Sequence, residues 1–166
     1  MLRWIVKLVA SNSLQEKRDG DIQMLPYPGQ WRSILLNDEG VLLWSNDDMK
    51  GCFFLFRLPP AWHKWFALNL VYFRGELGLD GDPFAPVYLA CTVIPVGTLS
   101  AMGIVQYLHR RMLIVGTGSP QSGPNGLPGD REVRKDKRVP VSLPHLKGYE
   151  KLWQVYADDE DTIEIL

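Results

Sequence analysis

The spacing of apolar residues changes at Pro95-Val96-Gly97, and this change limits the folds open to the chain. Before this point, apolar residues occur in short runs between turn-forming residues, a pattern typical of β-strands. After it, they recur at helical spacing as far as about Val115, and Gly116 stands where the helix should end. Antiparallel strands combined with one long helix predict an α+β fold.

Two pairs of apolar runs are separated by turn signals, so each pair predicts a β-hairpin. In the first pair, Asp80-Gly81 marks the turn. In the second pair, we expect an acidic turn of five residues, from Ala157 to Asp161. The four candidate strands are 65–73, 86–94, 152–156 and 162–166.

The sequence predicts an N-terminal segment, 1–40, and a main domain, 41–166. The opening run, Met1 to Ala10, has apolar residues at helical spacing and favours an amphipathic helix over a signal peptide; a turn-rich loop follows. Further apolar runs at 41–44 and 52–58 flank Asp47-Asp48 and predict two more strands. The stretch 116–140 is rich in Gly, Pro, Ser and charged residues, so we expect a flexible insert there.

Composition excludes several classes of protein. The 166 residues suit one domain, and 18 basic against 19 acidic residues exclude a histone-like binder of nucleic acid. Two cysteines exclude a disulfide scaffold, and the three histidines lack zinc-site spacing. No apolar stretch reaches the ~18 residues of a membrane span, which predicts an intracellular protein without a membrane partner. Phosphate-loop and Gly-x-Ser-x-Gly motifs are also missing from the sequence.

Two pairs of adjacent carboxylates, Asp47-Asp48 and Asp158-Asp159, adjoin apolar runs. Neighbouring carboxylates repel one another unless a cation or solvent screens them. Oxygen ligands of this kind suit Mg²⁺, and polymerases and nucleases use two such ions in phosphoryl transfer. The alternative is that each pair is a solvated turn.

Three segments carry motifs in a fixed order, each on a predicted element. The first is Asp48-Met49-Lys50-Gly51-Cys52-Phe53-Phe54, a strand-end Asp with an aromatic residue five positions on. The second is Thr92-Val93-Ile94-Pro95-Val96-Gly97, followed by a helix that carries Gln106. The third is Tyr156-Ala157-Asp158-Asp159. Together they resemble the palm motifs of reverse transcriptases of the retrotransposon type.

The resemblance implies a partial polymerase palm, with a helix after Gly97 packed on an antiparallel sheet and a C-terminal hairpin carrying Tyr-Ala-Asp-Asp. Segment 1–40 would be a remnant of the fingers. Asp48, Asp158 and Asp159 would be the catalytic residues and the ligands of Mg²⁺ or Mn²⁺. In this family a primer 3′-hydroxyl attacks the α-phosphate of a deoxynucleotide triphosphate, directed by an RNA or DNA template.

The same resemblance assigns residues around the nucleotide. Phe53 would lie under the sugar, Gly97 would let the backbone approach the nucleotide, and Gln106 would face the same groove from the helix. Tyr156 would contact the primer end. The alternatives are a core aromatic for Phe53 and a solvated helix residue for Gln106.

Basic residues in and after the helix are candidates for sequence-independent contacts with the phosphate backbone. The alternative for the run 131–138 is a solvated connector. The candidate residues are Arg110, Arg111, Arg134, Lys135 and Arg138.

Glu160 and Asp161 follow the acidic pair where the family usually has apolar residues. This concentration of negative charge should raise the pKa values of its own members. Three functions remain open: an active palm, a non-catalytic remnant that keeps the fold, and an unrelated α+β interaction domain with an exposed aromatic surface. The residues of that surface would be Trp62, Trp65, Phe66, Tyr72 and Phe73.

Overall fold

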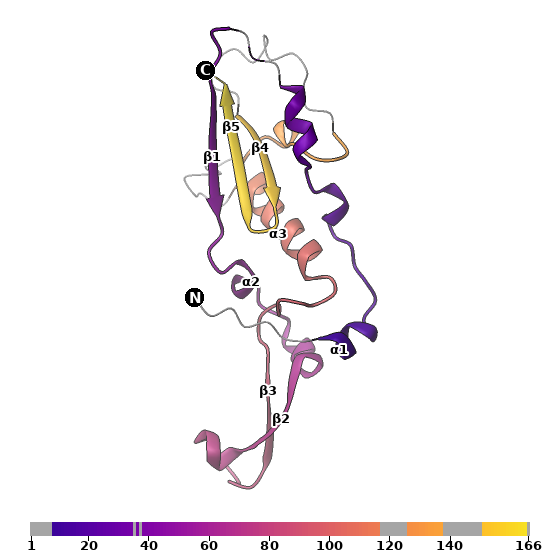
Figure 1. Ribbon diagram of the computed structural model, residues 1–166. Helices are drawn as coiled ribbons and strands as arrows, with labels where there is room; N and C mark the ends of the chain where they lie inside the picture. Colours follow the sequence, from indigo (N-terminus) through magenta and orange to yellow (C-terminus); the bar gives the residue numbers. More distant parts are fainter. Residues whose placement is uncertain (1–7, 35, 37, 117–125, 138–150, 166) are drawn as a thin grey trace. The chain divides into compact units, whose positions relative to one another are not determined.

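The computed structural model describes residues 8–34, 36, 38–116, 126–137 and 151–165 (Figure 1). Within them, the fold is mixed α+β, with a three-stranded and a two-stranded antiparallel sheet and one main helix. The expected fold class is therefore confirmed. No described helix has the length and apolar character needed to cross a membrane.

The chain divides into two compact units, and each is described by itself. One consists of Met1–Glu16 and Phe53–Ala101, and the other of Lys17–Cys52 and Met102–Leu166. These units do not coincide with a boundary at residue 40. The interpretation of 1–40 as a remnant of fingers stays a prediction.

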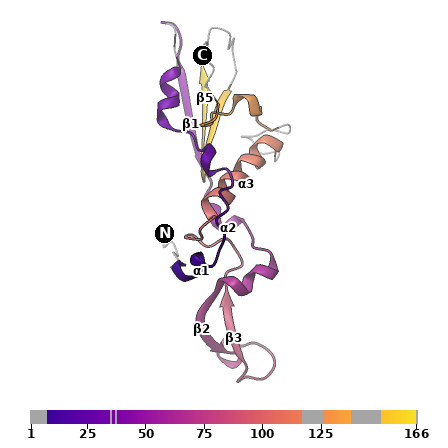
Figure 2. The same cartoon turned by 90° about the vertical axis from the view of Figure 1, so that its right-hand side faces the viewer.

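The second unit contains the three-stranded sheet, in the order β1-β5-β4, with β1 at Leu42–Asp48, β4 at Lys151–Tyr156 and β5 at Asp159–Ile165 (Figures 1 and 2). The C-terminal hairpin is confirmed, but the expected five-residue turn is wrong. Only Ala157 and Asp158 form the turn, because Asp159 already pairs with Tyr156 across the hairpin.

Alternation of side chains along the strands gives this sheet two apolar faces. On one face, Trp153 and Val155 pack against Leu113 of the main helix and against Leu127. On the other face, a second cluster joins the sheet to residues near the 3₁₀-helix Pro28–Ser33. Its members are Leu42, Leu152, Ile163, Val133, Trp31 and Ile34.

The main helix, α3, spans Ala101–Val115, as the helical spacing predicted. It ends at Gly116, which has a φ of +83° and donates its N–H to the carbonyl of Met112 at 3.0 Å. A positive φ is accessible to glycine without a steric penalty, so this residue ends the helix at the position expected from the sequence.

Residues 126–137, part of the expected flexible insert, pack against the sheet. They include the 3₁₀-helix Gly129–Arg131 and the buried Leu127 and Val133. Glu132 forms a parallel bridge with Trp153, and the N–H of Val133 donates to the Trp153 carbonyl at 2.7 Å. This part of the insert therefore has contacts with the sheet, and its flexibility stays a prediction. The rest of the expected insert, 117–125 and 138–140, lies outside the described residues.

The first unit contains the second hairpin, in which β2 (Ala67–Phe73) pairs with β3 (Pro86–Ala90), as predicted. The expected strand at 52–58 is wrong, because Cys52–Leu55 forms the single helical turn α2. The expected N-terminal helix falls mostly on residues 1–7, outside the described part. The first unit also contains α1 (Val9–Ser13) and the 3₁₀-helices Pro60–Phe66 and Arg74–Leu77, whereas the 3₁₀-helix Ile22–Met24 belongs to the second unit.

Candidate functional site

Two acidic segments far apart in the sequence meet at one end of the three-stranded sheet. Strand β1 ends at Asp48, and Asp48 lies directly opposite Asp159 in the register of β1 and β5. The N–H of Met49 donates to the Asp158 carbonyl at 2.8 Å, which extends the contact into the hairpin turn. The structure thus brings together Asp48, Asp158 and Asp159, with Tyr156 paired to Asp159 from the other side.

The register also sorts the acidic side chains onto two faces. Residues directly opposite each other share a face, and successive residues alternate. Asp48 therefore shares a face with Asp159, while Asp47 pairs with Glu160 on the opposite face. Asp47 and Asp48 therefore point to opposite sides of the sheet.

Negative charge accumulates at this end of the sheet. Partial burial, followed by the charges of Asp158, Asp48 and Asp161, raises the pKa of Asp159. Burial and the charges of Asp158 and Asp48 raise the pKa of the Cys52 thiol to about 11. Among the described residues, no basic side chain forms an ion pair with Asp48, Asp158 or Asp159. The site is therefore electronegative and has no internal counter-ion in this part of the chain.

Glu160 and Asp161 respond to the charge concentration in opposite ways. Burial raises the pKa of Glu160 to about 7, and the charges of Asp47 and Asp161 add to this effect. The increase agrees with the expected effect of crowded carboxylates. The expectation of a raised pKa is wrong for Asp161. Burial alone would raise its pKa, but hydrogen bonds from Gln154, Asn46 and Trp44 hold it below the ordinary value.

The Asp161 carboxylate accepts hydrogen bonds from side chains of both neighbouring strands. Its Oδ1 accepts from Trp44 Nε1 and from Asn46 Nδ2, each at 2.9 Å, and its Oδ2 accepts from Gln154 Nε2 at 2.6 Å. Asn46 and Gln154 are its register partners in β1 and β4. Asp161 is thus a structural member of the sheet, and its negative charge is stabilised by three neutral donors.

The hairpin turn is held by two buried side chains of α3. Gln106, only 2% exposed, donates from Nε2 to the Val155 carbonyl at 2.8 Å and accepts the N–H of Ala157 at 2.6 Å. His109 Nδ1 lies 2.8 Å from the Ala157 carbonyl, and burial lowers the pKa of this ring. The idea of a solvated Gln106 is wrong, and both polar atoms of its amide are occupied by the hairpin.

The sequence analysis missed the contribution of His109, because it considered the histidines only as zinc ligands. The signal was the three-residue spacing between Gln106 and His109, which places both on one face of a helix. Nothing local in the sequence indicates that this face meets the turn at Ala157. The contact joins residues 48 positions apart, so only the tertiary fold reveals it.

The other nucleotide-site candidates belong to the first unit. Phe53 lies on α2 and is partly buried. Gly97 has a φ of +104°, and its carbonyl accepts a hydrogen bond from Asn12 Nδ2 at 2.8 Å. Their proposed contacts with a nucleotide stay predictions.

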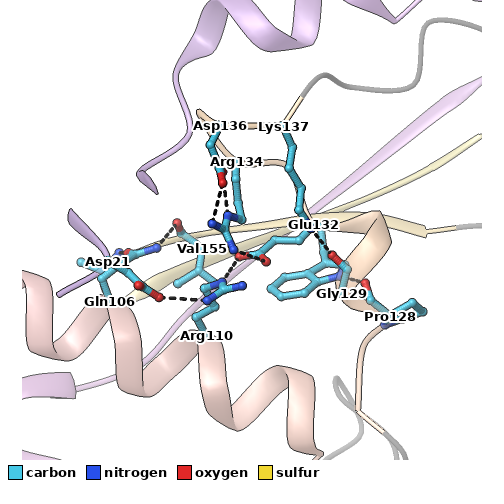
Figure 3. Close-up of polar contacts among 12 residues, drawn as sticks. Asp21, Gln106, Arg110, Pro128, Gly129, Glu132, Arg134, Asp136, Lys137 and Val155 are labelled. Atoms are coloured by element: carbon cyan, nitrogen blue, oxygen red, sulfur yellow. Dashed lines mark hydrogen bonds and ion pairs between the residues drawn. The ribbon is translucent and has the colours of Figure 1, made fainter. Parts of the chain in front are cut away.

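The described candidate basic residues fall into two groups, those held by ion pairs and those that are exposed. Arg110 forms ion pairs with the buried Glu132 and, at 3.0 Å, with Asp21 (Figure 3). Arg134 pairs with Asp136 at 2.7 Å and lies 3.8 Å from Glu132. These two guanidinium groups therefore stabilise the fold of segment 126–137. Arg111 and Lys135 are exposed, and Arg138 lies outside the described residues.

The expected aromatic surface is only partly exposed. Trp65 is 67% exposed and has the Lys64 ammonium 5.1 Å from its ring centroid, and Trp62 and Phe73 are also exposed. Phe66 is buried and Tyr72 is partly buried, so neither is fully available to a partner.

The donor set at the end of the sheet has the chemistry of a magnesium or manganese site, because carboxylate oxygens are the ligands these ions prefer. In the described part of the chain, however, no three or more His, Cys, Asp or Glu side chains are grouped so that they could hold a metal ion.

Comparison with models of protein families, with curated proteins and with solved structures finds no match for this chain.

Proposed function

We propose that this chain is the palm region of an RNA-directed DNA polymerase, which adds deoxynucleotides to a primer 3′-hydroxyl on an RNA or DNA template. The observation that carries the proposal is the pairing of Asp48 with Asp159, beside the hydrogen bond from Met49 to Asp158. Residues of the first and third motifs thereby lie beside each other at one sheet end. The helix of the second motif packs behind the hairpin that carries the third.

Asp48, Asp158 and Asp159 are the residues that would hold Mg²⁺ or Mn²⁺. Burial, and then the charges of Asp158, Asp48 and Asp161, raise the pKa of Asp159, and a divalent cation would relieve the part of this shift that comes from repulsion. When bound, such ions supply activation of the attacking hydroxyl and neutralisation of charge on the phosphates. The protein contributes the positioning of these carboxylates.

Other residues have roles that follow from their exposure. Tyr156 is 51% exposed at the end of β4 and is available to contact the primer end. Arg111 and Lys135 are available to contact phosphates, whereas Arg110 and Arg134 are held by ion pairs. Phe53 and Gly97 are proposed to contact the nucleotide. For Gln106, its hydrogen bonds favour support of the hairpin over direct contact with the nucleotide.

Primer extension on an RNA template tests the proposal, in Mg²⁺ and separately in Mn²⁺. Asp48→Asn and Asp158→Asn are expected to lose extension. Asp47→Asn is the matched control, because it removes the neighbouring charge on the opposite face of the same strand. A wild-type chain that does not extend the primer, or an Asp48→Asn variant as active as Asp47→Asn, would contradict the proposal.

A second candidate, a non-catalytic palm that binds nucleic acid, is favoured by one observation. The described acidic side chains are not grouped to hold a metal ion. If wild type and Asp158→Asn bind primer–template equally and neither extends it, this candidate replaces the first. No binding at low salt would instead favour a protein-interaction domain that uses Trp62, Trp65 and Phe73.

A further inference from the structure

The β2–β3 hairpin presents one apolar face to solvent. Val71 pairs with Tyr88, and Phe73 pairs with Pro86, so these four side chains share a face of the hairpin. Tyr88 is 59% exposed, Val71 54% and Phe73 45%, and Pro86 is also exposed. We call these four residues the exposed hairpin face.

The hairpin has only two strands to support this face. In the described part of the chain, β2 and β3 pair with each other alone (Figures 1 and 2). The pair Tyr72 and Val87 lies on the opposite face and is partly buried. A two-stranded hairpin is marginally stable in water unless an apolar face is covered, and a contiguous exposed apolar patch marks an interaction site. The exposed hairpin face therefore has the character of an interface.

The tip of the hairpin is acidic. Neither β2 nor β3 contains a charged residue. The connection between them, from Arg74 to Ala85, carries the carboxylates of Glu76, Asp80 and Asp82 against the single guanidinium of Arg74. Arg74 Nη1 donates to the Asp80 carbonyl at 2.7 Å, so this cation is held within the tip. The tip as a whole is therefore negative.

The open end of the hairpin is basic. Lys64 lies in the 3₁₀-helix that leads into β2, and Arg57 pairs with Val93 just beyond the end of β3. Both side chains are exposed, and segments 53–66 and 91–101 contain no acidic residue. The apolar face thus lies between a positive end and a negative end. A surface complementary to it must be apolar in the middle and carry the same two charges in reverse order.

We propose that the exposed hairpin face binds a second copy of the chain, with the two hairpins packed face to face and running in opposite directions. Each copy then covers the apolar face of the other with the same patch, as in an isologous interface. Each acidic tip lies beside the basic open end of the other hairpin. Hairpins running in the same direction would bring the two acidic tips together, and like charges facing each other disfavour association.

The size of the face sets the expected strength of the dimer. Stable interfaces bury about 800 Å² on each partner, and four side chains that are each about half exposed supply less than this. We therefore expect a reversible dimer with a Kd on the order of 10 µM. No residue of the acidic sheet end takes part, so the inference does not depend on the proposed function.

Sedimentation velocity of the full 166-residue chain at low salt, from about 1 to about 500 µM, measures the dimerisation. Tyr88→Ser removes the largest side chain of the face and should weaken the dimer about 10-fold or more. Leu89→Ser is the matched control, because Leu89 is the next residue on β3, points to the opposite face and is 41% exposed. Its dimerisation should stay within about twofold of wild type. If circular dichroism shows that Tyr88→Ser does not fold, Val71→Ser takes its place.

A charge exchange tests the opposite direction of the two hairpins. Glu76 and Asp82 accept backbone N–H groups of the hairpin, so Asp80 is the carboxylate to replace. Lys64→Glu and Asp80→Lys should each weaken the dimer about threefold, and the double variant should recover most of the loss. Lys64 and Asp80 lie at opposite ends of the hairpin, so an ion pair within one chain does not explain a recovery.

A chain that stays monomeric at about 500 µM would overturn the proposal. Equal dimerisation of the Tyr88→Ser and Leu89→Ser variants would also overturn it, because the dimer would then form through another surface. Charge variants that weaken the dimer without recovery in the double variant would overturn the antiparallel arrangement. A monomeric chain that binds phosphatidylcholine vesicles, with binding lost in Tyr88→Ser, would replace the second copy by a lipid surface.

Discussion

Asp48 at the end of β1 faces Asp159 at the start of β5 as a cross-strand pair of carboxylates. Like charges placed directly opposite in a sheet are destabilising, and proteins retain such pairs where another requirement outweighs the cost. Here the pair lies beside Asp158, whose carbonyl is bonded to the residue after Asp48. The cost in stability and the proposed cation site therefore arise from the same geometry.

The first prediction concerns this repulsion. Without divalent cations at neutral pH, Asp159→Asn should raise the free energy of unfolding by about 0.5 kcal/mol, since one member of the pair loses its charge. Because the folded-state pKa of Asp159 is raised, its ionisation makes stability fall as pH rises above 3.8. Urea unfolding measures the effect. Asp38→Asn, which changes net charge equally at an exposed site, is the control and should change little.

The second prediction concerns Glu160, which is buried with its Oε1 unpartnered among the described residues. Its folded-state pKa of about 7 lies above the ordinary value of 4.5, so the folded state binds the proton more tightly. Stability should therefore fall as pH rises from about 4.5 to about 7.

Glu160→Gln keeps the shape and removes the charge. Above a pH of about 7, this substitution should raise the free energy of unfolding by about 1–2 kcal/mol. This is less than the full pKa shift would give, because solvent near Asp47 screens the charge. The slope of stability against pH should also flatten. Urea unfolding across the window measures both effects, and an unchanged slope in the variant would show that Glu160 does not titrate as its burial implies.

The elements that could be predicted from the sequence have local signals. Helix α3 has a regular apolar period and a glycine at its end, and the β2–β3 pair has a turn signal between its strands. The run 52–58 was misassigned, because a short apolar run fits a strand and a buried helical turn equally well. Only its first four residues, Cys52–Leu55, became helical.

The acidic turn shows where local reasoning stops. A two-residue turn demands left-handed backbone, which normally calls for glycine or asparagine, and the sequence offers Ala157. The longer turn was therefore the reasonable expectation. The tight turn is held by a hydrogen bond from the Ala157 N–H to Gln106 and one from His109 to the Ala157 carbonyl, and both side chains lie about 50 positions earlier in the chain. Contacts of this range leave no periodic trace in one sequence.

The third prediction concerns Asp161. Replacing its carboxylate with the amide of Asp161→Asn turns one acceptor oxygen into a donor that faces other donors. Loss of the bonds from Gln154, or from Trp44 and Asn46, should lower the free energy of unfolding by about 1–2 kcal/mol. Because the pKa of Asp161 is lowered, its stabilising effect is present above pH 3.8 and is lost as pH falls through the lowered value.

Glu164→Gln provides the control on the same strand. Glu164 forms an ion pair with the exposed Lys151, and such surface pairs contribute about 0.5 kcal/mol or less. Thermal or urea unfolding should therefore separate the two variants clearly. Equal losses would mean that the three donors do not stabilise the Asp161 charge.

The last prediction concerns Arg110 and Glu132. The Glu132 side chain is only 2% exposed, so Arg110→Met would leave a buried carboxylate with the Arg134 guanidinium, 3.8 Å away, as its remaining charged neighbour among the described residues. Breaking a buried ion pair by removing one partner costs about 3–5 kcal/mol, and we expect the lower end of that range because Arg134 remains.

Replacing both partners, as Arg110→Met with Glu132→Met, should recover most of the loss, since no buried charge is then left uncompensated. Arg111→Met, at the exposed neighbouring position, should change stability by less than about 0.5 kcal/mol. Urea unfolding of the four chains, wild type included, forms the comparison. Equal stability of the Arg110→Met and Arg111→Met variants would mean that the ion pairs of Arg110 do not stabilise the fold. Arg110 would then be available to contact nucleic acid, as the sequence suggested. If the double variant stayed as unstable as Arg110→Met, burial of Glu132 without a partner would not be the source of the loss.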